Sequence, residues 1–207
     1  MERIPSFNLC CIDYRYDALA TQYFKDTENE FNYFLNTTAG SALCLGYKEY
    51  CIKNCFHPNK HNIKYDSCKC NNKTKEDQII QSCNPENKDM KLLKDSVKKN
   101  LEISISLKQV TEVYLLNHQD CGAIKAYLSC SGYPNYLGEN NAKEIEINTF
   151  LLNYASEYIY KKFPHIQNIK LGLIDINGTV ANFIDNEWII TYIGIGINPL
   201  GLWYGLV

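Results

Sequence analysis

Strand-like apolar segments alternate with amphipathic segments along this chain, and that alternation restricts the folds open to it. Residues 7–13 and 110–117 have the aliphatic and β-branched composition of buried strands. Between them, Leu93, Val97 and Leu101 recur at four-residue spacing, as one face of a helix does. Strands that alternate with helices predict an α/β fold, with a mostly parallel central sheet flanked by helices.

The second half of the chain continues the same pattern. Pro164 ends one amphipathic segment, and Asn177-Gly178 is a strong signal for a two-residue hairpin turn. The predicted elements here are helices over 122–129 and 145–163 and strands over 169–176, 179–184 and 187–193. The closing segment, 194–207, is apolar and glycine-rich, and we expect it to pack on the core or on a partner subunit.

Two thiols and one imidazole follow the predicted strands. Cys11 lies at the end of the first strand, and His118 and Cys121 lie on a strand-to-helix turn. Ligands of such sheets bind beyond the carboxyl ends of the strands, so these three side chains should meet there. Structural zinc sites use four protein ligands, whereas catalytic sites use three and leave one position open. The sequence therefore predicts a metal-activated hydroxide enzyme.

A carboxylate and a guanidinium accompany the first thiol. Asp13 is placed to accept a hydrogen bond from the reacting water, and Arg15 can hold the Asp13 carboxylate in a bidentate pair. Two thiolates cancel the formal charge of Zn²⁺, which weakens it as a Lewis acid, so neighbouring groups such as these become important.

Length and net charge argue against several other classes of function. The 207 residues predict a single domain, 1–207, and a formal net charge of −2 gives no reason to expect binding to nucleic acid or to a membrane. The first residues have no apolar core of a secretory signal, and no apolar run approaches the roughly 20 residues of a membrane span. We expect a soluble, cytoplasmic protein.

A polar stretch over 46–88 interrupts the pattern and reads as an insertion. Six of the ten cysteines fall between residues 44 and 83. A second, structural zinc, disulfides and free thiols are all open for this stretch, since its spacing matches no well-known zinc finger. The side chains concerned are Cys51, Cys55, His57, His61, Cys68, Cys70 and Cys83.

The paired motifs resemble the signature of the β-class carbonic anhydrases. Cys11-x-Asp13-x-Arg15 and His118-x-x-Cys121-Gly122 carry the similarity. Thr38-Ala39-Gly40 stands where the family has an Asn-Ala-Gly turn, and the segments 94–117 and 171–178 are also similar. The resemblance covers roughly residues 7–45 and 90–185, so this chain looks like a divergent member with a Cys-rich insertion.

The resemblance implies an activity and a cofactor. Cys11, His118 and Cys121 would bind Zn²⁺, and Asp13 and Arg15 would form the catalytic dyad. The reaction would be that of a carbonic anhydrase, a zinc lyase: reversible hydration of carbon dioxide to bicarbonate by zinc-bound hydroxide.

The resemblance also implies a pocket and an assembly. Ala39, Gly40 and Gly122 would line the substrate pocket. The protein would be a homodimer or higher homo-oligomer, and Asp13 could swing onto the zinc in an inactive form.

Two other functions compete with this reading. Tyr14 replaces a residue that is commonly small in the family, so Tyr14 and the insertion could reshape the pocket entrance and favour another small electrophile such as CS2 or COS. Alternatively, the chain could be a catalytically silent structural or assembly subunit with the same fold. Retention of Asp13 and Arg15 argues against that alternative, because a structural zinc does not require them.

Overall fold

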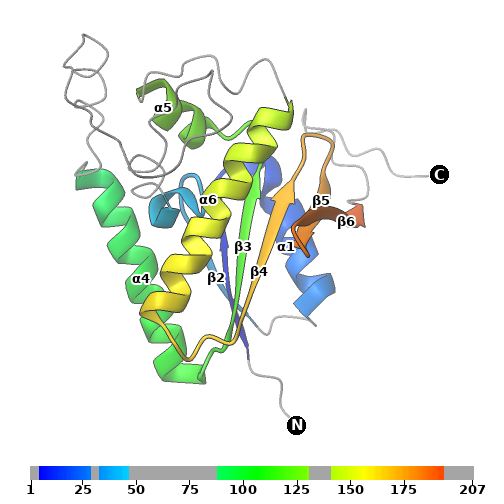
Figure 1. The fold of residues 1–207 in the computed structure, drawn as a ribbon. Coiled ribbons are helices and arrows are strands. Elements are labelled where there is room, and N and C mark those ends of the chain that lie inside the picture. Colours follow the sequence, from blue (N-terminus) through cyan, green and yellow to red (C-terminus); the bar gives the residue numbers. More distant parts are fainter. Residues whose placement is uncertain (1–4, 29–32, 47–87, 131–140, 194–207) are drawn as a thin grey trace.

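A computed structural model of the chain describes residues 5–28, 33–46, 88–130 and 141–193. Within these ranges the chain forms one six-stranded sheet with helices on both faces (Figure 1). The strands are β1 (Ser6–Cys10), β2 (Tyr33–Thr37), β3 (Glu112–His118), β4 (Asn168–Ile174), β5 (Thr179–Ile184) and β6 (Glu187–Ile193). The long helices are α1 (Tyr14–Glu28), α4 (Lys88–Lys108), α5 (Gly122–Cys130) and α6 (Asn141–Lys162).

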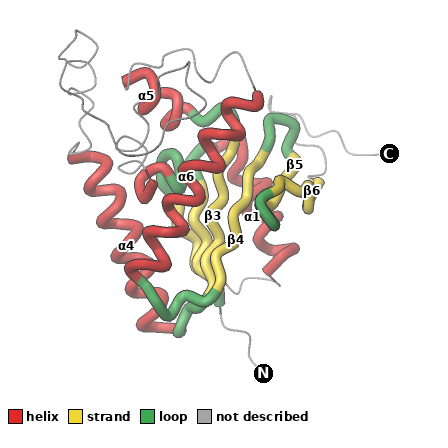
Figure 2. Tube along the Cα trace, in the orientation of Figure 1, coloured by secondary structure: helices red, strands yellow, loops and turns green. Residues whose placement is uncertain are grey.

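The sheet has the order β2-β1-β3-β4-β5-β6. The first four strands in that order are parallel, whereas β5 and β6 extend the sheet as an antiparallel hairpin. The prediction of an α/β fold with a mostly parallel central sheet flanked by helices is confirmed. The strands form one layer with helices on both sides (Figure 2). Because β1 and β3 are adjacent and parallel, their carboxyl ends lie at one edge of the sheet.

Two apolar layers hold the sheet between its helices. On one face, Leu9 and Leu115 pack with Val97 of α4 and Leu152 of α6. On the other face, Tyr114 and its neighbours pack with α1. Since β3 is covered on both sides, almost every one of its residues is buried, as a central parallel strand requires.

Helix α1 was not predicted, although its sequence contains a helical stripe. Tyr16, Leu19, Ala20, Tyr23 and Phe24 follow the i, i+3, i+4, i+7, i+8 spacing, and all five are buried. Asp13 caps the helix: its Oδ1 accepts the backbone N–H of Arg15 at 3.1 Å. The chain therefore leaves β1 at Cys10, and the strand predicted over 7–13 is shorter than expected.

The turn between β4 and β5 differs from the prediction of a two-residue Asn177-Gly178 hairpin. Asp175 N–H donates to the Thr179 carbonyl at 2.9 Å, so three residues form the loop, and Gly178 takes the left-handed conformation with φ +81°. The Asp175 carboxylate stabilises this longer loop by accepting the backbone N–H groups of Asn177 and Thr179. The two-residue prediction is wrong for that reason.

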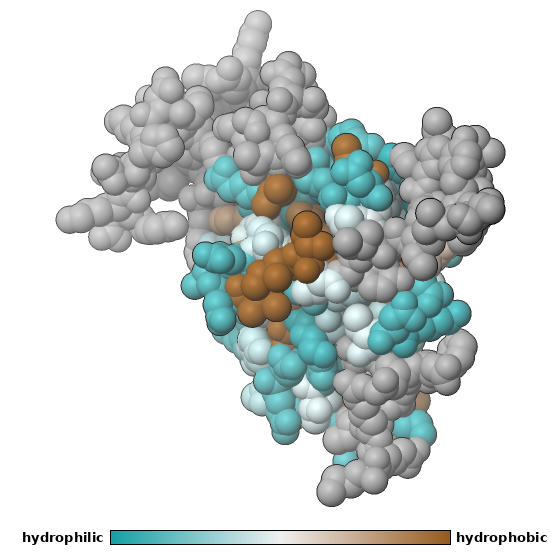
Figure 3. Space-filling model, turned by 90° about the vertical axis from the view of Figure 1, so that its right-hand side faces the viewer, coloured by the Kyte–Doolittle hydropathy of each residue, from teal (hydrophilic) through white to brown (hydrophobic). Residues whose placement is uncertain are grey.

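The predicted strands over 179–184 and 187–193 are present with those bounds, the other predicted elements are present with one or both ends shifted, and β2 is an additional strand. The Cys-rich insertion predicted over 46–88 and the closing segment over 194–207 lie outside the described residues, apart from the ends of the insertion. None of the helices in the described ranges has an apolar stretch long enough to cross a membrane. On the side that carries β5 and β6, apolar side chains reach the surface (Figure 3), among them Ile184, Ile189 and Ile190.

Candidate metal centre

Three side chains predicted as metal ligands meet at the carboxyl edge of the sheet. Cys11 directly follows β1, His118 ends β3, and Cys121 directly precedes α5. One ligand atom of each lies within 4.8 Å of the others. We refer to Cys11, His118 and Cys121 as the ligand triad.

One nitrogen of the His118 imidazole has no hydrogen-bond partner. His118 is 2% exposed, and its Nδ1 lies 2.7 Å from the Gln119 carbonyl oxygen. A carbonyl can only accept, so Nδ1 carries the proton and Nε2 carries a lone pair. Nε2 is buried and has no hydrogen-bond partner. A buried polar atom without a partner costs free energy. A metal ion would satisfy Nε2, because metal-binding histidines donate the N–H of their other ring nitrogen to an acceptor, as Nδ1 does here.

The two thiols of the triad are hydrogen-bonded to each other. Their Sγ atoms lie 3.9 Å apart, far beyond the length of a disulfide, and both cysteines are free. The hydrogen bond from Cys121, together with that from the Gly40 N–H at 3.3 Å, lowers the pKa of Cys11 despite its burial. The pKa of Cys121 is raised, first by its hydrogen bond to Cys11 and then by burial.

This donor set fits zinc. Tetrahedral coordination with Zn–S bonds of about 2.3 Å places two sulfurs about 3.8 Å apart, close to the 3.9 Å observed. A divalent cation would also remove the electrostatic obstacle to ionising the second thiol. Cysteine thiolates and an imidazole are ligands that zinc takes in catalytic sites, where three protein ligands leave one position open.

Asp13 and Arg15 form the bidentate ion pair that their spacing predicts. Arg15 Nε lies 3.0 Å from Asp13 Oδ1, and Arg15 Nη2 lies 2.7 Å from Asp13 Oδ2. This side-chain hydrogen bonding by Arg15 lowers the pKa of Asp13, so the carboxylate is ionised at neutral pH. Asp13 Oδ2 also lies 3.8 Å from His118 Nε2. The carboxylate therefore stands next to the triad while Arg15 holds it.

Three further residues contact this site and were missed from the sequence. The ring of Tyr16 lies 4.4 Å from that of His118, centroid to centroid. Asp120 binds Arg15, and the buried Glu144 accepts the backbone N–H of Asp120. Asp120 stands between two proposed ligands in the sequence, which is a usable signal, whereas nothing in the local pattern around Glu144 points to the site.

The residues predicted to line the substrate pocket differ in their surroundings. Gly40 is buried with φ +75°, and a Cβ there would meet Leu43 at 2.9 Å, so this position at the Cys11 sulfur requires glycine. Gly122 is exposed, and a Cβ there would meet nothing within 4 Å, while Ala39 is half-buried. Tyr14 is 86% exposed, so it is not packed over the triad as the narrowing of the pocket would require.

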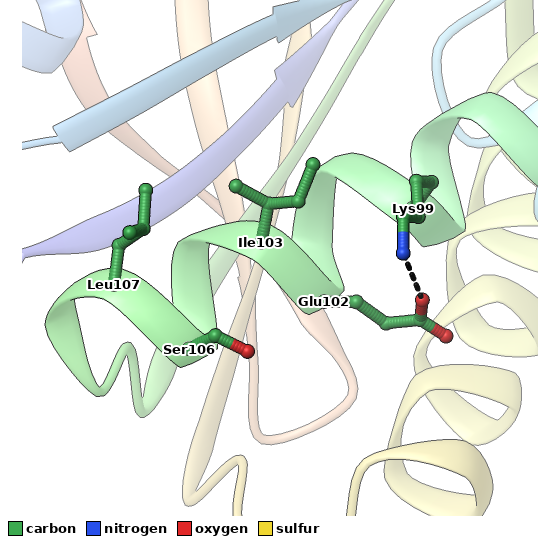
Figure 4. A pocket seen from close by; sticks show the side chains of 5 residues that line it. All are labelled: Lys99, Glu102, Ile103, Ser106 and Leu107. Carbon is green, nitrogen blue, oxygen red and sulfur yellow. Dashed lines mark ion pairs between the residues drawn. The ribbon is translucent and has the colours of Figure 1, made fainter.

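A surface pocket of about 470 Å³ lies elsewhere, on α4 (Figure 4). Its lining comes entirely from that helix: Lys99, Glu102, Ile103, Ser106 and Leu107. It shares no residue with the triad, and its charged residues form an ordinary helix-surface pair, with 3.7 Å between Lys99 Nζ and Glu102 Oε2. The cysteines and histidines of the insertion, which could bind a second metal ion, lie outside the described residues, so that alternative stays open.

Comparison with known proteins adds two solved structures. No family model matches the chain, and no curated protein matches it. The chain is similar to the β-carbonic anhydrase CcaA, with 13% identity and a TM-score of 0.49 over 99% of this chain and 86% of that one. It is also similar to the β-carbonic anhydrase CafA of the fungal pathogen Aspergillus fumigatus, with 11% identity and a TM-score of 0.36 over 89% of this chain and 77% of that one. Because both TM-scores are below 0.5, we take function from the geometry of the site.

Proposed function

We propose that the protein is a zinc-dependent carbonic anhydrase, which hydrates carbon dioxide reversibly to bicarbonate. The observation that carries the proposal is the buried, unpaired Nε2 of His118, which faces two free thiols beside an ionised Asp13 held by Arg15. Cys11, His118 and Cys121 would hold the zinc ion. A zinc ion bound there lowers the pKa of a water molecule toward neutrality and so supplies a strong nucleophile.

Asp13 has the position and charge to orient that nucleophile. A carboxylate accepts hydrogen bonds but donates none, so Asp13 would accept a hydrogen bond from the reacting oxygen. This hydrogen bond would direct a lone pair of that oxygen toward carbon dioxide. Arg15 fixes the orientation of the carboxylate, because a planar guanidinium binds both oxygens at once.

Gly40 and Tyr16 support the ligands. The N–H of Gly40 donates to the Cys11 sulfur and reduces the charge that this thiolate places on a metal. The ring of Tyr16 packs on His118 and fixes the plane of the imidazole. Because two thiolates make zinc a weaker Lewis acid, we expect activity to depend strongly on Asp13 and Arg15.

The alternative functions have less support. The exposure of Tyr14 removes one reason to favour CS2 or COS over carbon dioxide; the other, a reshaping of the pocket entrance by the insertion, concerns residues outside the described ranges. A silent structural subunit would need Asp13 only as the cap of α1, and that role does not require the bidentate pair with Arg15 beside the triad. Since the ligands must be thiolates, we place the protein in a reducing compartment such as the cytoplasm. The homodimer or higher oligomer that the resemblance implies stays a prediction, which light scattering can test.

Zinc content and stopped-flow hydration of carbon dioxide test the proposal together. We expect about one zinc bound at the triad per chain, and about 10²-fold or greater loss of kcat in Asp13→Asn with zinc retained. The matched control is Asp17→Asn, an exposed acid in the first turn of α1, which should behave as wild type. A zinc-loaded wild-type protein that hydrates no carbon dioxide at any pH contradicts the proposal. Activity on CS2 or COS, with none on carbon dioxide, would show that the proposed substrate is wrong.

A further inference from the structure

Arg15 has a second acidic partner, on the opposite motif. Its Nη1 lies 2.7 Å from Asp120 Oδ2, and its Nη2 lies 3.0 Å from the Asp120 carbonyl oxygen. With the two bonds to Asp13, four of the five guanidinium N–H groups are engaged. The guanidinium is thus held along both edges, by residues 105 positions apart in the sequence.

Asp120 is itself fixed from several sides. It adopts the left-handed conformation with φ +57°, which aspartate tolerates better than most residues. Its N–H donates to the carboxylate of Glu144, which is only 7% exposed, and Lys125 of α5 pairs with the Asp120 carboxylate. The Asp120 side chain is therefore a prearranged anchor, with its backbone tied to α6 and its carboxylate to α5.

We propose that Asp120 is a positioning residue: by holding the outer edge of Arg15, it keeps the Asp13 carboxylate on Arg15 and away from the metal position. This inference concerns the same site as the proposed function and rests on it. Arg15 is the group that competes with a metal ion for Asp13, whose Oδ2 lies 3.8 Å from His118 Nε2. The Arg15 side chain is 26% exposed, so without Asp120 it gains freedom to turn toward solvent.

Loss of this anchor should favour coordination of Asp13 to the metal, which blocks the open position. The consequence is specific: an exogenous anion that needs that position should bind more weakly. The effect should also depend on the presence of Asp13, since Asp13 is the group that takes the position.

Azide binding to the cobalt(II)-loaded protein, followed by visible absorption, tests the proposal. Asp120→Gly removes the carboxylate and keeps the left-handed backbone without strain. We expect azide affinity to fall about tenfold or more, in line with the loss of a charge-assisted contact. Asp120→Asn keeps one acceptor and should shift the affinity in the same direction by less, which provides a second variant if Asp120→Gly does not fold.

The double variant Asp13→Asn/Asp120→Gly distinguishes positioning from damage. If Asp120 acts through Asp13, removing the Asp13 charge restores azide affinity to that of Asp13→Asn alone. Unchanged affinity in both Asp120 variants overturns the proposal, and so does a loss that Asp13→Asn does not restore. The control is Asp185→Gly, the same substitution at another left-handed position, in the exposed β5–β6 turn, which should leave azide binding unchanged.

Failure of the proposed function would look different. A wild-type protein that takes up no cobalt or zinc at the triad contradicts the metal site and the role of Asp120 with it. A wild-type protein that binds cobalt and azide but hydrates no carbon dioxide contradicts the activity only, and the Asp120 series still decides its positioning role.

Discussion

The ligand triad and the ion-pair group of Asp13, Arg15 and Asp120 come from the same two motifs, yet their bonding differs. The triad contains a buried nitrogen with no partner and two thiols that are hydrogen-bonded to each other. The ion-pair side chains are 16%, 26% and 40% exposed, and each has its partners within the group or in α5. A buried, unpaired nitrogen beside two thiols is a place where a metal ion could bind, whereas the paired side chains next to it are arranged to orient a bound group.

The largest expected effect is on the triad. Cys121→Ser should reduce zinc at this site to near zero and abolish hydration, because a hydroxyl does not replace a thiolate ligand. Loss of the bound ion should also lower the free energy of unfolding, by about 2.7 kcal/mol if free zinc is about 100-fold above its Kd. Zinc content and urea denaturation measure these effects.

The control for that substitution is another buried free cysteine. Cys44 is fully buried and lies in the apolar layer near α4 and α6, so Cys44→Ala should keep its zinc. If Cys121→Ser keeps zinc and Cys44→Ala loses it, the ligand assignment is wrong and the distinction between the two groups fails.

An intermediate effect is expected in the ion-pair group. Arg15→Lys keeps the charge but has no planar fork, so it cannot bind both oxygens of Asp13 and the two acceptors of Asp120 together. We expect about tenfold lower kcat, with zinc content unchanged. Stopped-flow rates at saturating carbon dioxide, with zinc measured on the same samples, give the result. Equal rates for the two proteins would show that Arg15 acts as a simple charge.

The smallest effect is expected at Asp175. Its carboxylate lies at the same edge of the sheet and has hydrogen-bond partners, but it does not contact Arg15. Burial would raise the pKa of Asp175, but hydrogen bonds from Thr179 and Asn177 outweigh it, so the pKa is lowered. Asp175→Asn should therefore cost about 1 kcal/mol of unfolding free energy at pH 7 and leave zinc and hydration unchanged.

The pH dependence of that cost follows from the direction of the shift. A carboxyl with a lowered folded-state pKa stabilises the fold above its unfolded pKa of about 3.9, and this contribution is lost as the pH falls through the folded value. The difference between wild type and Asp175→Asn should thus shrink below about pH 4, as urea denaturation at several pH values can show. Asp185→Asn, in an exposed turn, is the control; a pH-independent difference for Asp175→Asn would contradict this origin.

The sequence predicted the triad better than its surroundings, for a physical reason. Cys11 and His118 follow apolar strands, and adjacent parallel strands bring their carboxyl ends together, so position in the chain predicts proximity. The contact of Asp120 with Arg15 depends on a left-handed residue and on side-chain direction across two loops. Neither the left-handed conformation nor the side-chain direction can be predicted from residue spacing.

The unpredicted elements have different causes. Helix α1 carries a readable stripe, but tyrosines make up part of it, and tyrosine has weak helix propensity. Strand β2 is a five-residue edge strand with a mixed burial pattern, too short for periodicity to distinguish it from a loop. The predicted hairpin between β4 and β5 is present, but its loop is longer than two residues because Asp175, outside the Asn-Gly pair, stabilises the longer loop.

An anomalous difference map at the zinc absorption edge, from crystals of protein purified without chelators, tests the central claim most directly. We predict a peak within bonding distance of the Cys11 sulfur, the Cys121 sulfur and His118 Nε2, with Asp13 still paired to Arg15. A zinc-containing crystal with no peak between these three atoms would contradict it.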